Sequence, residues 1–371
     1  MVTIHWTFSR IPQYACFSIK NFFRKCHLVC RSLTYNHFLD QSYIADVCME
    51  PLFWFVDNFT YTIGPIFVVS VIGLTVSVVI IAYWIGIPYW WNRNPIICIL
   101  LLIVGHWLLL NISFHYYMAV ITSPGYPPQG ELIPEAVSIC KKCISPKPPR
   151  THHCSACNRC ILKMDHHCPW INNCVGYGNH RYFFLYMVYM VLGVLFVIVC
   201  GFDLAYTDIW LTPSDVDDPE LEGHSVKFNQ TGALIPVTDV PHLDSSLLDD
   251  EPAYNYINPW RRRALVYMAL INCGVLLALG MLSLWHSQLI SKGETCIEAN
   301  INKAETVRLK QLGKTYSNPY NFGRKKNWKI FLGLVQGRTF VRHVLFPSAH
   351  KPLGDGLKWH TIHDEDIDEW P

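Results

Sequence analysis

The residues best suited to chemistry lie in one short segment, where seven of the fifteen cysteines fall between positions 140 and 174. A set of three cysteines and one histidine with the spacing C-x2-C-x9-H-x6-C occurs there twice, the second copy shifted by 14 residues. Three thiolates and one imidazole form a closed tetrahedral Zn²⁺ site, and a segment with so little apolar core needs metal to fold. We predict two structural zinc sites; another partition of the eight ligands and a set of disulfides are the alternatives. The two sets are Cys140, Cys143, His153 and Cys160, and Cys154, Cys157, His167 and Cys174.

One cysteine of this segment, Cys168, has no place in either set. A third set beginning there would need ligands at positions 171, 181 and 188, which hold Ile, Arg and Val and cannot bind metal. The thiol is preceded by His166, a candidate base, and by Asp165, a candidate group to orient that base. These are the parts of a Cys-His-Asp nucleophile system, so we predict catalysis at Cys168. The alternative is a bystander thiol in a binding module.

Four apolar stretches must position this segment, at about 66–87, 96–121, 182–206 and 264–290, and none contains Lys or Arg. Each exceeds the roughly 20 residues that cross a bilayer. The chain is 51% hydrophobic and only 16% charged, which argues against an ordinary cytosolic enzyme, and its net charge of +2 argues against a nucleic-acid partner. We predict an α-helical integral membrane protein, in which four transmembrane helices hold a cytosolic two-zinc, cysteine-rich domain between the second and the third.

The distribution of charge predicts the orientation. The loop over 122–181 carries seven Lys and Arg residues and the tail is also basic, which favours the cytosol, whereas the loop over 207–263 is acidic and reads as lumenal. Arg261, Arg262 and Arg263 fit this orientation poorly, and Asn229 begins a weak N-glycosylation triplet. The predicted organisation is a cytosolic region with an interfacial aromatic segment over 1–65, spans within 66–121, the zinc domain over 122–181, a span over 182–206, the lumenal loop over 207–263, a span over 264–290 and a cytosolic tail over 291–371. The basic, acid-poor start also resembles a mitochondrial transit peptide, the less favoured interpretation.

At Asp165-His166-His167-Cys168 the sequence resembles the DHHC protein S-acyltransferase family. The whole pattern C-x2-C-x9-H-C-x2-C-x2-C-x4-D-H-H-C-x5-C-x4-N-x3-F is present, ending at Asn179 and Phe183. The phrases over 125–130 and 139–143 look most like its Abl-philin branch. Two departures are Ser123 in the family's Asp-Pro-Gly motif and Cys296 in its Thr-Thr-x-Glu motif, and we read both as tolerated; a regulatory acylation site is the alternative for Cys296.

This resemblance implies an acyl-enzyme reaction. Cys168 takes a long-chain acyl group from palmitoyl-CoA and passes it to a cysteine of a substrate protein near the bilayer; His166 takes the thiol proton and Asp165 orients His166. Family likeness further implies residence in the endoplasmic reticulum or Golgi with both termini in the cytosol, and a C-terminal motif in which Asn327 caps backbone near the active site. A non-catalytic zinc adaptor is the alternative, and a channel or transporter ranks last because the spans offer few polar residues.

A long acyl chain needs an apolar cavity between the four helices. Resemblance places Trp170, Phe183 and Tyr186 along its mouth, Gly193 where chain length is selected, and Lys147 at the CoA phosphate. Close helix packing is an equally good explanation of Gly193. His106, His115 and His286 also fall in the spans, and we assign them no function because neutral, hydrogen-bonded histidines near helix ends are common.

Overall fold

The structure, a computed structural model, describes residues 20–28, 30–31, 63–128, 133–208, 227–228, 234–235 and 259–364. The predicted interfacial aromatic segment at 50–61 and Asn229 lie outside these residues. A short two-stranded pairing, β7 (Lys227–Phe228) with β8 (Leu234–Ile235), is described within the predicted lumenal loop.

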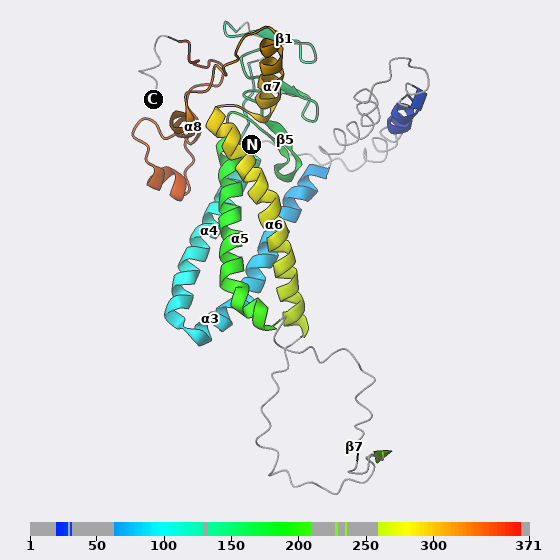
Figure 1. Cartoon of the computed structure of the whole chain (residues 1–371), viewed down its shortest axis with the longest axis vertical. Coiled ribbons are helices and arrows are strands. Elements are labelled where there is room, and N and C mark those ends of the chain that lie inside the picture. Colours follow the sequence, from blue (N-terminus) through cyan, green and yellow to red (C-terminus); the bar gives the residue numbers. More distant parts are fainter. Residues whose placement is uncertain are drawn as a thin grey trace.

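Four helices dominate the described chain and are long and apolar enough to cross a membrane, which confirms the predicted fold class. They run antiparallel to their neighbours in sequence (Figure 1). They are Ile63–Arg93, which includes the π-helical segment η2 (Ala82–Gly86) and α3 (Ile87–Arg93), and then α4 (Pro95–Ile121), α5 (His180–Tyr206) and α6 (Pro259–Lys292). Many apolar side chains of the first helix face outward, as lipid contact requires: Ile66, Val69 and Ile80 are 62%, 68% and 60% exposed.

The first and second helices meet at Asn94, whose extended backbone ends one helix and begins the next. Its side-chain oxygen accepts hydrogen bonds from the amides of Ile96 and Ile97, and Pro95 occupies the first turn, where no amide is needed. The first helix thus reaches six residues past the predicted end at 87. The apolar pattern missed these residues because they are polar and aromatic.

Ion pairs explain the charges at this end of the bundle. Arg93 lies 2.6 Å from Asp203 of α5, and Arg261 of α6 lies 2.8 Å from Asp208. Of the three arginines that fitted the charge rule poorly, Arg261 is therefore paired with a carboxylate. α6 itself begins at Pro259, before the apolar stretch begins.

Three small antiparallel hairpins follow α4, each shifted by 14 residues from the last. Each turn contains one residue in the left-handed region, at the same place in the repeat: Ile144 (φ 52°), Asn158 (φ 50°) and Asn172 (φ 48°). Asparagine tolerates this backbone, whereas isoleucine does so at a cost in strain. The pairs are β1 (Ser138–Cys140) with β2 (Ser145–Lys147), β3 (His152–Cys154) with β4 (Arg159–Ile161), and β5 (His166–Cys168) with β6 (Asn173–Val175).

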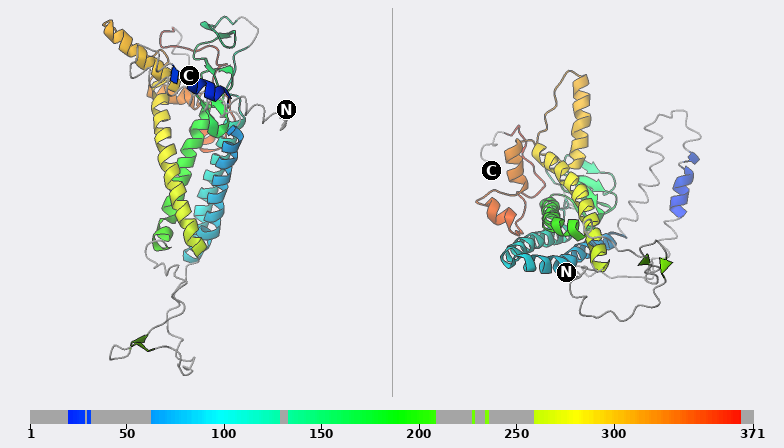
Figure 2. Two further views of the ribbon diagram at one scale, coloured as in Figure 1. Left: turned by 90° about the vertical axis from the view of Figure 1, so that its right-hand side faces the viewer. Right: turned by 60° about the horizontal axis from the view of Figure 1, so that its bottom comes forward.

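The remaining elements gather with the hairpins at one end of the helix bundle (Figures 1 and 2). After α6 come α7 (Cys296–Gln311), α8 (Arg324–Phe331) and the π-helical turn η6 (Val341–Leu345). Asn327 of α8 donates to the carbonyl of Ser291 and accepts from the amide of Phe322, so it ties the tail to the end of α6. Because α4 ends here, α5 begins here and α6 ends here, this is the end where the hairpins meet the bundle.

Candidate active site

The first predicted ligand set comes together in space. The ligand atoms of Cys140, Cys143, His153 and Cys160 all lie within 4.8 Å of one another. His153 Nδ1 is 3.1 Å from Cys143 Sγ and 3.7 Å from Cys140 Sγ, and the sulfurs of Cys143 and Cys160 are 3.8 Å apart. A tetrahedral ion with Zn–S bonds of about 2.3 Å holds its sulfurs about 3.8 Å apart. The donor set and its spacing fit zinc.

The second set has the same geometry. His167 Nδ1 lies 3.3 Å from Cys157 Sγ, 3.5 Å from Cys174 Sγ and 3.8 Å from Cys154 Sγ. Each set takes two cysteines from one hairpin and a histidine and a cysteine from the next, so two metal ions would join three hairpins in a row. The partition of the eight ligands that the spacing predicted is the one that the structure brings together.

This arrangement explains why Cys168 is left over. Cys140, Cys154 and Cys168 hold equivalent places in the three hairpins, at the last position of each first strand. The first two can join a metal with the next hairpin, but after the third hairpin the chain enters α5. Cys168 is only 5% exposed and belongs to the apolar cluster formed with α4 and α5. A thiol that belongs to neither Cys3His set is thus placed where the hairpins meet the membrane helices.

Asp165 and His166 lie beside this thiol as a hydrogen-bonded pair. His166 Nδ1 is 2.6 Å from Asp165 Oδ2, and the side chain of Asp165 is fully buried. The other carboxylate oxygen, Oδ1, accepts the backbone amide of Cys296 at 2.8 Å. Because Cys296 opens α7, the carboxylate also lies at a helix N-terminus, which favours negative charge. The second nitrogen of the His166 ring is left for another partner.

These contacts shift the protonation of both groups. Burial raises the pKa of Asp165, but the positive charge of neighbouring histidines and the His166 hydrogen bond outweigh it, so the pKa lies below its usual value. Burial lowers the pKa of His166, but hydrogen bonds with Asp165, Cys168 and Cys296 outweigh it, and the pKa is raised well above 6.5. His166 is therefore a stronger base than an ordinary histidine.

A capped helix holds the backbone amide that binds Asp165. Thr295 Oγ1 accepts the amide of Glu298, and Glu298 Oε2 accepts the amide of Thr295 at 2.9 Å, which forms a capping box. Arg150 binds both oxygens of Glu298 at 2.6 Å and also the carbonyl of Gly293. Since the backbone amide of Cys296 makes this hydrogen bond, threonine at that position is dispensable for it.

Two further histidines, His286 and His180, lie around Asp165, and neither was predicted as a site residue. His286 Nδ1 of α6 lies 4.0 Å from Asp165 Oδ2, and its ring centroid is 5.8 Å from that of His166. His180, the first residue of α5, packs 5.8 Å from His286. His286, to which the sequence analysis assigned no function, thus lies next to the predicted catalytic pair. Its place six residues before the end of α6 was the signal available, because that end must approach the zinc domain.

The residues predicted along the acyl path lie in different places. Phe183 packs 5.2 Å from the His166 ring, and Tyr186 packs 4.9 Å from Tyr116 of α4. Trp170 is 55% exposed, beside Phe67 of the first helix, and its carbonyl accepts the hydroxyl of Tyr116. Lys147 belongs to the first hairpin, whereas Cys168 belongs to the third.

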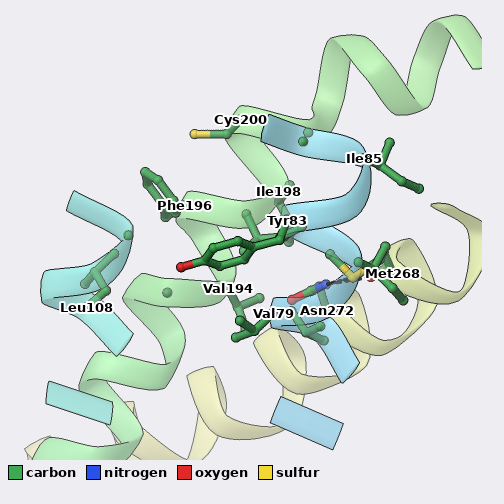
Figure 3. A pocket seen from close by; sticks show the side chains of 18 of the residues that line it. Val79, Tyr83, Ile85, Leu108, Val194, Phe196, Ile198, Cys200, Met268 and Asn272 are labelled. Carbon is green, nitrogen blue, oxygen red and sulfur yellow. Dashed lines mark hydrogen bonds between the residues drawn. The ribbon is translucent and has the colours of Figure 1, made fainter. Parts of the chain in front are cut away.

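Below these aromatic residues, the four helices enclose an apolar cavity of about 560 Å³. Figure 3 shows Tyr83 projecting into it, with Phe196 and Ile198 of α5 nearby. Gly193 lines the end nearer the hairpins, and a Cβ there would lie 2.8 Å from Ile112 Cδ1 of α4. Gly193 therefore both borders the cavity and permits α5 to approach α4.

This combination of four apolar helices, two Cys3His sets and a free Cys168 beside His166 and Asp165 matches one class of protein. The family model for the DHHC palmitoyltransferase matches residues 134–303, and the chain belongs to this family. Palmitoyltransferase ZDHHC16B from Danio rerio is 43% identical over 337 residues, 90% of this chain and 86% of the relative. Palmitoyltransferase ZDHHC16 from Homo sapiens is 45% identical over 331 residues, 89% and 84% of the two chains. The family predicted from the motif, and its Abl-philin branch, are confirmed.

A more distant relative carries the same family assignment. The probable protein S-acyltransferase 12 from Arabidopsis thaliana is 28% identical over 279 residues, 70% of this chain and 82% of the relative. The likeness therefore extends well beyond the cysteine-rich segment and includes the helices around it.

Proposed function

We propose that this chain is a protein S-acyltransferase that carries the acyl group on Cys168. The observation that supports this most directly is the position of a metal-free thiol, at the junction of the hairpins and the apolar helices, beside the buried Asp165–His166 pair. A long acyl-CoA, usually palmitoyl-CoA, is the donor, and a membrane-proximal cysteine of a substrate protein is the acceptor.

The reaction has two balanced steps. His166 takes the proton of the Cys168 thiol, the thiolate attacks the thioester carbonyl of the acyl-CoA, and the CoA sulfur leaves with the proton that His166 returns. A substrate thiol then gives its proton to His166 and attacks the acyl-enzyme, which restores Cys168. Exchange of one thioester for another needs no external energy source.

The other groups position these atoms. Asp165 orients His166 and stabilises its protonated ring. Two Zn²⁺ ions, bound by the two Cys3His sets, supply structural stability, because the hairpins have little core of their own. Phe183, Tyr186 and Trp170 border the route from Cys168 toward the cavity that would hold the acyl chain. Lys147 is a candidate contact for the CoA phosphates.

The first test is labelling of the purified, zinc-loaded protein with alkyne-tagged palmitoyl-CoA, in wild type and in Cys168→Ser. We expect a label on wild type that neutral hydroxylamine removes and that the variant lacks. Label that survives Cys168→Ser undiminished would mean that another residue is the nucleophile. Absence of label from the folded wild type would favour the zinc adaptor, which would keep its partner binding in the variant.

We further propose that the protein lies in the membrane of the endoplasmic reticulum or Golgi with both termini in the cytosol. The hairpins and the described tail lie at the same end of the bundle, which supports a shared compartment for them. Antibody access to terminal tags after selective permeabilisation of the plasma membrane measures this. Tags reached only after the internal membranes are opened would reverse the orientation.

A further inference from the structure

Beside Cys168 lies a third group of metal-binding side chains, distinct from the two zinc sets. Ligand atoms of Asp165, His166, His286 and Cys296 all lie within 4.8 Å of one another. They come from three elements, since His286 belongs to the end of α6, Cys296 opens α7, and the other two residues enter the third hairpin. None of the four is shared with the Cys3His sets. Catalysis as proposed above uses Asp165 and His166 and leaves the side chains of the other two unexplained.

His286 is the strongest indication of a ligand at this place. Its side chain is only 2% exposed, and Nδ1 has no hydrogen-bond partner among the described residues. That nitrogen faces Asp165 Oδ2 from 4.0 Å, which is too long for a hydrogen bond. A buried polar atom without a partner costs stability, so its retention here needs an explanation.

Cys296 completes the donor set. Its backbone amide is fixed on Asp165 Oδ1 at 2.8 Å, which holds the residue against the carboxylate and places the thiol beside His166. The side chain is partly buried within the same group. Two imidazoles, one thiolate and one carboxylate are donors that suit Zn²⁺ and related transition metals, and they do not suit Mg²⁺ or Ca²⁺.

We propose that Asp165, His166, His286 and Cys296 form a third, inhibitory site for a transition-metal ion such as Zn²⁺. The site rests on the proposed function, because two of its ligands are the groups that activate Cys168. An ion there replaces the hydrogen bond between Asp165 and His166, and the His166 ring becomes a ligand and can no longer take the thiol proton. Binding of metal and acylation of Cys168 therefore exclude each other.

The geometry requires only small movements. His166 Nδ1 and Asp165 Oδ2 are 2.6 Å apart, and His286 Nδ1 and Asp165 Oδ2 are 4.0 Å apart. Ligands of a tetrahedral zinc ion at bonds of about 2.0 Å are about 3.3 Å apart, between these two values. Binding displaces the proton of the Cys296 thiol and that of a protonated His166 to solvent. Occupancy of this third site rises with the concentration of free metal. The two structural sites are unaffected, because they share no ligand with it.

Cys296→Thr is the variant that tests the site. Threonine keeps the backbone amide that serves Asp165 and removes the thiolate ligand. The matched control is Cys273→Ser, which removes an exposed cysteine of α6 that belongs to none of the metal groups. His286→Asn removes a second ligand independently, so the test does not depend on one substitution.

The experiment uses full-length protein that retains two zinc ions per chain, verified by elemental analysis, and adds Co²⁺ and then Zn²⁺. We expect a third ion, a thiolate-to-cobalt absorption band in wild type and Cys273→Ser, and its loss in Cys296→Thr. Autoacylation should fall as the third ion binds and recover with a weak chelator. The metal concentration for half-inhibition, measured against each variant's own metal-free rate, should rise about tenfold or more in Cys296→Thr and in His286→Asn.

The outcomes separate this proposal from the proposed function. Absence of a third ion from protein that acylates itself would overturn the metal site and leave the acyltransferase intact. Inhibition that is equal in wild type and Cys296→Thr would also overturn it, because the metal would then act elsewhere. Absence of acylation in metal-free wild type would refute the proposed function, while the cobalt band would still decide whether the site exists.

Discussion

At the scale of single residues, Asp165 is the group on which the site depends most. One oxygen accepts from His166 and the other from the amide of Cys296, so the carboxylate fixes the base relative to α7. Asp165→Asn places an amide group where His166 must donate, and it removes the charge that stabilises the protonated ring. We expect the rate of autoacylation to fall roughly 10²-fold or more, with both zinc ions retained. Rapid-quench labelling measures the rate.

A suitable control is Asp355→Asn, because Asp355 also accepts two backbone amides, those of Leu357 and Lys358, but in an exposed turn. This variant should label at the wild-type rate. If Asp165→Asn labels as fast as Asp355→Asn, the carboxylate has no part in activating Cys168.

Gly193 gives a second prediction, on chain length. It lies ten residues beyond Phe183 along α5, a distance of about 15 Å at a rise of about 1.5 Å per residue. Gly193→Tyr fills the near end of the cavity, so we expect palmitoyl-CoA to lose rate relative to shorter acyl-CoAs. Competition between donors of different length measures the ratio. Unchanged selectivity with lowered thermal stability would assign Gly193 to packing against Ile112 alone.

Sequence reasoning identified the candidate nucleophile because, of the seven cysteines between 140 and 174, the 14-residue repeat leaves only Cys168 without a ligand set. It did not reach His286, since a histidine within an apolar stretch looks the same whether it faces lipid, a helix or an active site. Arg150 and Glu298 were missed as a pair for a related reason. They are 148 residues apart in sequence. Only the folded chain shows that Arg150 binds Glu298, which caps the start of α7.

At the scale of elements, the hairpins illustrate how metal replaces a core. Each zinc set joins two successive hairpins, and only the second set holds the hairpin that carries Cys168. Cys143 and Cys157 occupy equivalent places, one in each set, so Cys143→Ser and Cys157→Ser are matched substitutions. We expect each variant to lose about one zinc ion per chain, and Cys157→Ser to lose far more autoacylation. Elemental analysis and labelling of the same samples test this.

Equal loss of activity in both variants, with one ion lost from each, would contradict the expectation that only the second zinc set positions the hairpin of Cys168. It would mean that the first hairpin also positions Cys168 directly. Loss of both ions from either variant would show instead that the two sites fold as one unit.

The helices themselves were predictable, because an apolar run of this length has few other structures, but their ends were not. Arg93 and Arg261 extend two of the helices beyond their apolar runs by pairing with Asp203 and Asp208. Such pairs join segments that are far apart in sequence. From composition alone, these arginines are therefore predicted to be loop residues or exceptions to the positive-inside rule.

At the scale of the whole molecule, the tail packs against α4 and α5 of the bundle. Tyr189 of α5 donates to the carbonyl of Val344 at 2.6 Å, and Trp107 of α4 donates to that of Leu345 at 2.9 Å. Arg181, a buried cation next to His180, donates to the carbonyls of Ser348 and His350 at 3.1 Å and 2.9 Å. The carbonyl groups of the tail thus accept hydrogen bonds from helix side chains, those of Trp107, Arg181 and Tyr189.

This arrangement predicts a coupling between Arg181 and the tail. Ending the chain at Pro347 removes both carbonyl acceptors and leaves a buried charge unpaired, which costs about 1.5–3 kcal/mol for hydrogen bonds to a charged group. Arg181→Met should therefore lower the free energy of unfolding of the full chain. In the shortened chain the same substitution should lower it much less, or even raise it. Thermal unfolding of the four proteins in one detergent measures the coupling.

Tyr189→Phe is the control, since its acceptor Val344 precedes the cut and its cost should be equal in both backgrounds. Equal costs for Arg181→Met in both would show that the tail carbonyls do not stabilise this arginine.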